Sequence, residues 1–98
     1  MTQSYKRVSA VKTAFEILEH LSDQAGPVSP KQIGIALRLP YGTVMSHIAT
    51  LSDGGYVVDA GDGVRIGTRM GGFWLRVKAG AEMKRTTIEQ ALSVLGGI

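Results

Sequence analysis

Few residues in this sequence have the types and spacing that catalysis or metal binding requires. The chain has no cysteine and two histidines, His20 and His47, which fall in different predicted helices. Neither histidine has a neighbouring motif that would supply a nucleophile or an orienting carboxylate. Two isolated histidines without cysteine also make no zinc site. We therefore expect a non-enzymatic protein without metal ligands or cofactors.

The glycine-rich stretch GDGVRIG, residues 61–67, has the look of a phosphate-binding loop. Its spacing differs from the G-x-G-x-x-G pattern of nucleotide loops, and it joins two predicted strands, so no helix N-terminus would face a phosphate there. Turn residues between two short apolar runs are typical of a β-hairpin. We interpret the stretch as a hairpin tip.

Length and composition indicate a small globular protein. The chain has 98 residues, of which 44% are hydrophobic and 19% charged, a balance that excludes a disordered chain. No apolar run approaches the roughly 20 residues that a membrane span needs, and no apolar stretch follows Lys6 and Arg7 as in a secretory signal. These features predict a cytoplasmic protein that does not bind membranes.

The charge is distributed unevenly along the chain. The net charge is +3, which favours an anionic partner. Residues 39–64 nevertheless contain three acids (Asp53, Asp59 and Asp62) and no lysine or arginine. The lysines and arginines therefore lie on either side of a central segment that has none. Any basic side chain that contacts a nucleic acid must come from residues 1–38 or 65–98.

Two helices are predicted in the first forty residues. Apolar residues at spacings of three and four predict a helix over about residues 9–24, with a buried stripe of Val11, Ala14, Phe15, Leu18 and Leu21. Ser29 and Gln32 form a capping-box pattern around Pro30, which predicts a second helix that ends before Pro40. Its expected buried residues are Ile33, Ala36 and Leu37.

A third helix is predicted over about residues 41–53, with Val44, Ile48 and Leu51 in the core. Its opposite side carries small residues, Gly42, Ser46 and Ala49, flanked by Thr43, Met45 and Thr50. The hairpin of residues 56–67 follows, with Arg65 pointing away from its apolar neighbours. A mainly helical chain with one small hairpin in this order is what a winged helix-turn-helix requires, and such a fold presents its third helix to the major groove of DNA.

The remaining residues predict one or two further helices. A segment with Phe73, Trp74 and Val77 has a helical pattern that Gly80 weakens, and a last helix with Ile88 and Leu92 is expected to start around Thr86 or Thr87. We expect a winged helix-turn-helix domain over residues 1–70 and a helical extension over residues 71–98.

Four short motifs occur in order along residues 8–70: VSAVKTAFEIL at 8–18, LPYGTV at 39–44, GYV at 55–57 and IGTRM at 66–70. With these motifs, residues 8–70 resemble the N-terminal DNA-binding domain of IclR-type transcriptional regulators. The first motif is similar to the first helix of that family, the second to the start of its recognition helix, and the last two to the start and the end of its wing. The resemblance implies a transcriptional regulator that binds double-stranded DNA, and a helix after the wing that contributes to dimerisation.

Three departures from the family pattern are visible. Ser46 stands where the family usually has an arginine, and Tyr41 stands where a lysine or similar polar residue is common. The family's C-terminal effector-binding domain has no counterpart before Ile98, so no small-molecule effector can be inferred. We expect either a small regulator, such as one from a phage or mobile element, or a fragment of a longer one.

The small side of the third helix supplies the expected base contacts. Gly42 would allow close approach of the backbone, Met45 would contact a thymine methyl group, and hydrogen bonds would come from Thr43, Ser46 and Thr50. Tyr41 would donate to a phosphate near the start of the helix. The expected phosphate or minor-groove contacts outside this helix are Lys31, Arg38, Arg65 and Arg69, together with Lys6 and Arg7 in an N-terminal arm.

Modest affinity from one subunit predicts a homodimer. The expected interface residues are Phe73, Trp74, Val77, Ile88 and Leu92, although Trp74 could instead cap the core of its own domain. Two other functions stay open. A third helix without lysine or arginine also fits a protein-interaction adapter, and a phage or mobile-element factor that handles DNA without regulating it would use the same contacts.

Overall fold

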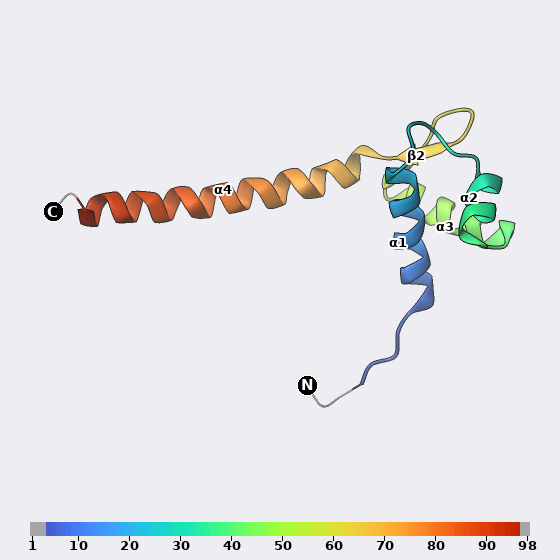
Figure 1. Ribbon diagram of the computed structural model, residues 1–98, viewed down its shortest axis with the longest axis horizontal. Coiled ribbons are helices and arrows are strands. Elements are labelled where there is room, and N and C mark those ends of the chain that lie inside the picture. The colour runs from blue at the N-terminus through green and yellow to red at the C-terminus, as the bar shows by residue number, and fades with distance from the viewer. Residues whose placement is uncertain (1–3, 97–98) are drawn as a thin grey trace. The chain divides into compact units, whose positions relative to one another are not determined.

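The computed structural model describes residues 4–96. It contains the helices α1 (Ser9–Ser22), α2 (Pro30–Leu37) and α3 (Tyr41–Asp53), then the strands β1 (Val57–Asp59) and β2 (Val64–Ile66), and finally α4 (Thr68–Gly96) (Figure 1). This order is that of a winged helix-turn-helix followed by one helix, which confirms the predicted fold class. The described residues fall into two units that divide between Thr68 and Arg69, and we describe each unit by itself.

The core of the first unit lies where three helices meet the hairpin. α1 contacts α2, α3 and β2, and α3 also contacts α2 and β1. The four largest fully buried side chains come from four different elements: Ile17, Ile33, Val44 and Val57. Among the described residues no polar or charged side chain is buried, so burial of apolar surface holds this unit together.

The buried side of α1 differs from the predicted stripe. Leu18 and Leu21 are buried as expected, but the third buried residue is Ile17, whereas Val11 is exposed and Phe15 is 58% exposed. Two apolar stripes overlap on this helix, and spacing alone does not separate them. The stripe through Ile17 faces the other elements, so the assignment of Val11 and Phe15 to the core was wrong.

The second helix begins as its capping pattern predicts. The Ser29 hydroxyl accepts from the Gln32 amide and the Gln32 side chain accepts from the Ser29 amide, both at 3.2 Å, with Pro30 in the first turn. The helix ends at Arg38, which adopts a left-handed backbone (φ 57°, ψ 48°). Ile33 is buried, but Ala36 is exposed, contrary to expectation, because an eight-residue helix turns only a narrow side to the core.

The turn from α2 to α3 is tight. The Leu39 amide donates to the Gly34 carbonyl oxygen at 2.9 Å, and a Cβ atom on Gly34 would lie 2.9 Å from the carbonyl oxygen of Leu39. Such a short contact with backbone is one that only glycine avoids at this position. α3 then follows with Val44, Ile48 and Leu51 buried as predicted.

The hairpin gains a third partner that the sequence did not reveal. β1 and β2 pair antiparallel, with Val57 opposite Ile66 and Asp59 opposite Val64. On its other side, Val64 forms an isolated bridge with Val28, in the segment between α1 and α2. The hairpin is thereby attached to the linker that precedes α2.

The second unit is one helix rather than two. α4 runs without a break over 29 residues and includes Gly71, Gly72 and Gly80. The predicted new start at Thr86 or Thr87 is wrong: the Thr87 hydroxyl donates to the Met83 carbonyl oxygen at 3.0 Å, an interaction within a continuing helix. Arg85 and Glu89 are also paired one turn apart, at 3.8 Å. Within residues 4–96 we find no helix with the length and apolar character needed to span a membrane.

Candidate nucleic-acid interface

The outward side of α3 is the candidate interface. Val44, Ile48 and Leu51 fix the inward side, which leaves Gly42, Met45, Ser46, Ala49 and Thr50 exposed and Thr43 partly covered. Tyr41 stands in the first turn with 61% of its surface exposed. The structure thus brings six of the predicted contact residues onto one short helix: Tyr41, Gly42, Thr43, Met45, Ser46 and Thr50.

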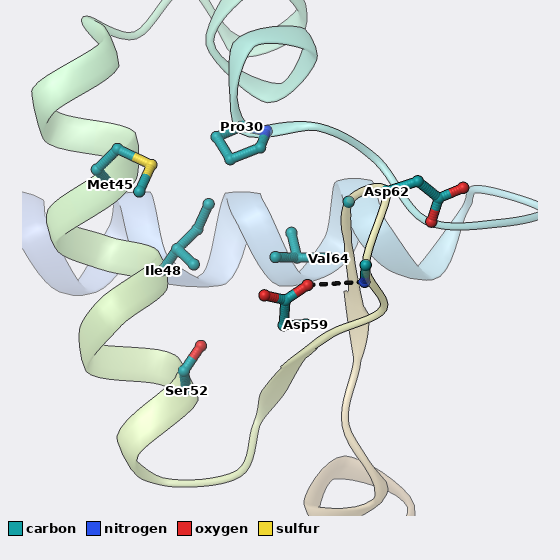
Figure 2. Close-up of a pocket in the computed structure, with 9 residues that line it drawn as sticks. Pro30, Met45, Ile48, Ser52, Asp59, Asp62 and Val64 are labelled. Atoms are coloured by element: carbon teal, nitrogen blue, oxygen red, sulfur yellow. Dashed lines mark hydrogen bonds between the residues drawn. The ribbon is translucent and has the colours of Figure 1, made fainter.

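One flank of α3 faces the hairpin. Met45, Ile48 and Ser52 of α3 line a hollow of about 380 Å³ together with Pro30, Val64 and the residues of the hairpin tip (Figure 2). Two acidic residues of the hairpin line this hollow: Asp59, whose side chain accepts a hydrogen bond from the Gly61 amide at 2.8 Å, and Asp62, whose carboxylate points away from α3 in Figure 2. This flank is therefore acidic.

The other flank of α3 faces the first turns of α1. Ser46, His47 and Thr50 line a second hollow of about 310 Å³ with Ala10 and Val11. His47 bridges the two helices: its Nδ1 lies 2.7 Å from the Thr43 carbonyl oxygen, and its Nε2 lies 3.2 Å from the carbonyl oxygen of Ala10. The sequence placed His47 at the edge of the core but held no signal for its partner in α1.

The hydroxyl groups on this side of α3 are not equivalent. Thr50 Oγ1 donates to the Ser46 carbonyl oxygen at 3.0 Å, so its proton is used within the helix. Its oxygen lone pairs are left to accept from outside. A ligand that approaches Thr50 therefore meets an acceptor.

Two basic residues, Lys31 of α2 and Arg38 directly after it, lie near the start of α3. Lys31 and Tyr41 line the same small hollow, of about 210 Å³, together with Gly34, Ile35 and Leu39. Arg38 is exposed at the turn between the two helices. The structure thus brings Lys31 and Arg38 to the edge of the candidate interface.

Arg65 and Arg69, the two arginines predicted to act with the wing, do not lie beside Lys31 and Arg38. Arg65 is exposed on β2, but it lines a hollow of about 350 Å³ with Leu21, Ser22 and Gln24 at the end of α1, and no residue of α3 lines that hollow. Arg69 is exposed in the first turn of α4, in the second unit. The structure therefore does not group Arg65 with the predicted contact residues of α3.

The basic side chains at the edge of the interface form no ion pair with any of residues 4–96. In the described part of the protein, ion pairs join Lys12 to Glu16 and Arg85 to Glu89. Lys31 and Arg38 belong to neither pair, so their charges are available to an anionic partner.

No cluster of metal-ligating side chains is found among residues 4–96. In this part of the chain, no three or more histidine, aspartate or glutamate side chains lie where they could share a metal ion.

The family comparison concerns this same region. The model of the IclR helix-turn-helix domain matches residues 10–60, which is just over half of the 98 residues and spans the first unit from α1 to β1. The searches among curated proteins and among solved structures returned no match to this chain. On the strength of the family match, the chain belongs to the IclR helix-turn-helix domain family.

Proposed function

We propose that this protein binds double-stranded DNA as a transcriptional regulator, with α3 in the major groove and the hairpin as a wing. The observation that carries the proposal is the outward side of α3 in a chain of the IclR helix-turn-helix family. Small side chains on that side would let the helix approach the base edges closely, and the buried opposite side holds the helix rigidly in place.

The residues on α3 suggest how bases would be read. Met45 provides an apolar contact for a thymine methyl group, and Ser46 can donate or accept. Because the Thr50 proton is used within the helix, Thr50 would accept from the exocyclic amino group of adenine or cytosine. Tyr41, Lys31 and Arg38 would bind phosphates at the edge of the groove, and Arg65 and Arg69 would add contacts from the wing and from the start of α4.

We also propose that the protein acts as a homodimer through α4. At about 100° per residue, Trp74, Val77, Ile88 and Leu92 fall on one side of this helix, with Phe73 beside them. All five side chains are exposed, Trp74 to 65%. A second copy would cover this apolar side and double the phosphate contacts presented to DNA.

A titration with DNA at two salt concentrations tests the proposal. The anisotropy of a short labelled random-sequence duplex should rise with micromolar protein at about 50 mM salt and should weaken steeply towards about 200 mM, because phosphate contacts release counterions. Selection of a preferred sequence from a random pool would then identify the operator. Absence of binding at the lower salt concentration would contradict the proposal.

Docking of a protein partner on α3 is a second candidate function. The observation that favours it is the charge beside this helix: residues 39–64 hold no lysine or arginine, and Asp59 and Asp62 flank its outward side. If the protein docks a protein partner, replacing Arg65 and Arg69 by alanine would leave partner binding unchanged. If the protein binds DNA, the same replacement would lower the affinity for DNA and make it depend less steeply on salt.

A further inference from the structure

The start of α1 contacts α3 through the side chain of His47. His47 Nε2 lies 3.2 Å from the carbonyl oxygen of Ala10, in the first turn of α1. A carbonyl oxygen only accepts, so the contact with Ala10 is a hydrogen bond when Nε2 of the ring carries a hydrogen. Nδ1 of the same ring lies 2.7 Å from the Thr43 carbonyl oxygen, and a ring that donates to both carbonyls carries a hydrogen on each nitrogen. The start of α1 is thus held beside the middle of α3.

Two positive charges precede this point of attachment. Lys6 and Arg7 are both exposed, and Arg7 is three residues before Ala10. Since each residue spans at most about 3.6 Å, the Arg7 backbone lies within about 11 Å of the Ala10 backbone. The Arg7 guanidinium donates to the Tyr5 carbonyl oxygen at 2.9 Å through Nη1, and its other N–H groups can reach a second acceptor.

The opposite flank of α3 carries the opposite charge. Asp59 and Asp62 line the hollow between α3 and the hairpin tip. A phosphate backbone on that flank meets carboxylates, whereas on the α1 flank it meets the neutral side chains of Ser46 and Thr50 and, beyond them, the basic arm. The charges on the two flanks favour phosphate contacts on the side of α1.

We infer that Lys6 and Arg7 bind the DNA phosphate backbone beside the groove that α3 enters, and that His47 is a positioning residue which holds the arm there. This inference rests on the proposed DNA binding. Without the bond to Ala10, α1 would keep its buried contacts through Ile17, Leu18 and Leu21, but its first turn would lose its attachment to α3. Lys6 and Arg7 would then be held less firmly beside the DNA, and their contribution to the affinity would fall.

The first test compares a double variant of the full chain with a control variant by the salt dependence of binding to a labelled random duplex. Lys6→Ala with Arg7→Ala removes the arm charges. Lys12→Ala removes an exposed charge from the side of α1 opposite Ala10 and is the control. Each lost phosphate contact lowers the slope of log affinity against log salt by about 0.9. Raising the salt concentration from about 50 to about 200 mM weakens the binding of both proteins. The factor of weakening should be about ten times smaller for the arm variant than for the wild type. The control variant should match the wild-type slope.

The second test concerns His47. His47→Ala should shift the slope towards that of the arm variant, and adding His47→Ala to the arm variant should change the slope no further. His47→Gln keeps a donor that can reach Ala10 and should restore most of the wild-type slope. Circular dichroism melting of each variant shows whether the domain stays folded, and a change in stability alone would not alter the salt slope.

The outcomes separate this inference from the proposed function. If the wild type binds DNA and the arm variant keeps its full salt slope, the arm contact is wrong while DNA binding stands. If the arm variant loses slope and folded His47→Ala does not, His47 does not position the arm. If the wild type shows no salt-dependent binding, both the inference and the proposed function fall.

Discussion

Val28 and Val64 are joined by two backbone hydrogen bonds, from the Val28 amide to the Val64 carbonyl oxygen at 2.9 Å and from the Val64 amide to the Val28 carbonyl oxygen at 2.8 Å. Both side chains are buried. The segment between α1 and α2 thereby acts as a third strand beside the hairpin. A two-stranded hairpin alone has little stability in water, so this pairing supports the wing from the side of the core.

The close approach of these segments depends on Gly63. A Cβ atom there would lie 2.8 Å from the Val28 carbonyl carbon and oxygen, so backbone would have to move. We expect Gly63→Ala to lower the free energy of unfolding by about 1–3 kcal/mol, the range for overpacked sites. Urea denaturation measures this change. Gly26→Ala is the control, because a Cβ atom at Gly26 meets nothing within 4 Å. Equal midpoints for the two variants would contradict the packing argument.

Arg38 allows stability to be separated from DNA binding. Its left-handed backbone, with φ at 57°, is strained in a residue that has a Cβ atom. We expect Arg38→Gly to raise the free energy of unfolding by roughly 0.5–1 kcal/mol, and Arg38→Ala to bring no such gain. Both variants should bind DNA more weakly than the wild type, and by the same factor, because both lose the proposed phosphate contact. Thermal melting and DNA anisotropy on the same samples measure the two effects. An equal rise in unfolding free energy for the glycine and the alanine variants would argue against backbone strain at this position.

The carboxylate of Asp62 should oppose DNA binding. Two unit charges about 10 Å apart in water interact by about 0.4 kcal/mol, so Asp62→Asn should tighten binding roughly twofold at low salt. The gain should vanish as salt screens the interaction. Glu82→Gln removes an exposed acid from α4 and serves as the control. An unchanged affinity for Asp62→Asn at low salt would place the DNA away from the hairpin tip.

Two exposed positions on opposite sides of α4 test the proposed dimer. Ile88 lies on the side of Trp74 and Val77, whereas Met83 lies about 180° from Trp74 around the helix. Burying a carboxylate in an apolar interface is costly, so Ile88→Glu should weaken self-association more than about tenfold. Met83→Glu, at a side chain that is 70% exposed, should leave self-association unchanged. Sedimentation velocity over a range of concentrations measures both, and equal behaviour of the two variants would exclude this side of α4 as the interface.

Local signals in the sequence predicted much of the fold. The capping pattern at Ser29 and Gln32 and the position of Pro40 gave the start of α2 and α3 correctly, because these residues satisfy or interrupt backbone hydrogen bonds next to themselves. The core positions of α3 were also correct, because this helix carries a single apolar stripe.

Features that depend on other parts of the chain were not predictable. The choice between Ile17 and Phe15 on α1 depends on where the neighbouring elements lie, which periodicity does not contain. The bond between His47 and Ala10 joins residues 37 positions apart, and nothing local marks either one. The glycines of α4 suggested a break, yet a helix can continue through a glycine at a cost of about 1 kcal/mol.

The composition of α4 makes its helical structure depend on whether its apolar side is covered. Gly71, Gly72 and Gly80 lie inside a helix whose large apolar side chains are exposed, so local propensity alone supports it weakly. Covering the side that holds Trp74 and Ile88 would supply the missing stabilisation, and the segment would then fold as it associates. Under the proposed dimerisation, backbone amides of residues 69–96 would exchange with solvent rapidly in dilute protein and slowly in concentrated protein. This segment would thus report by its hydrogen exchange how much of the protein is assembled.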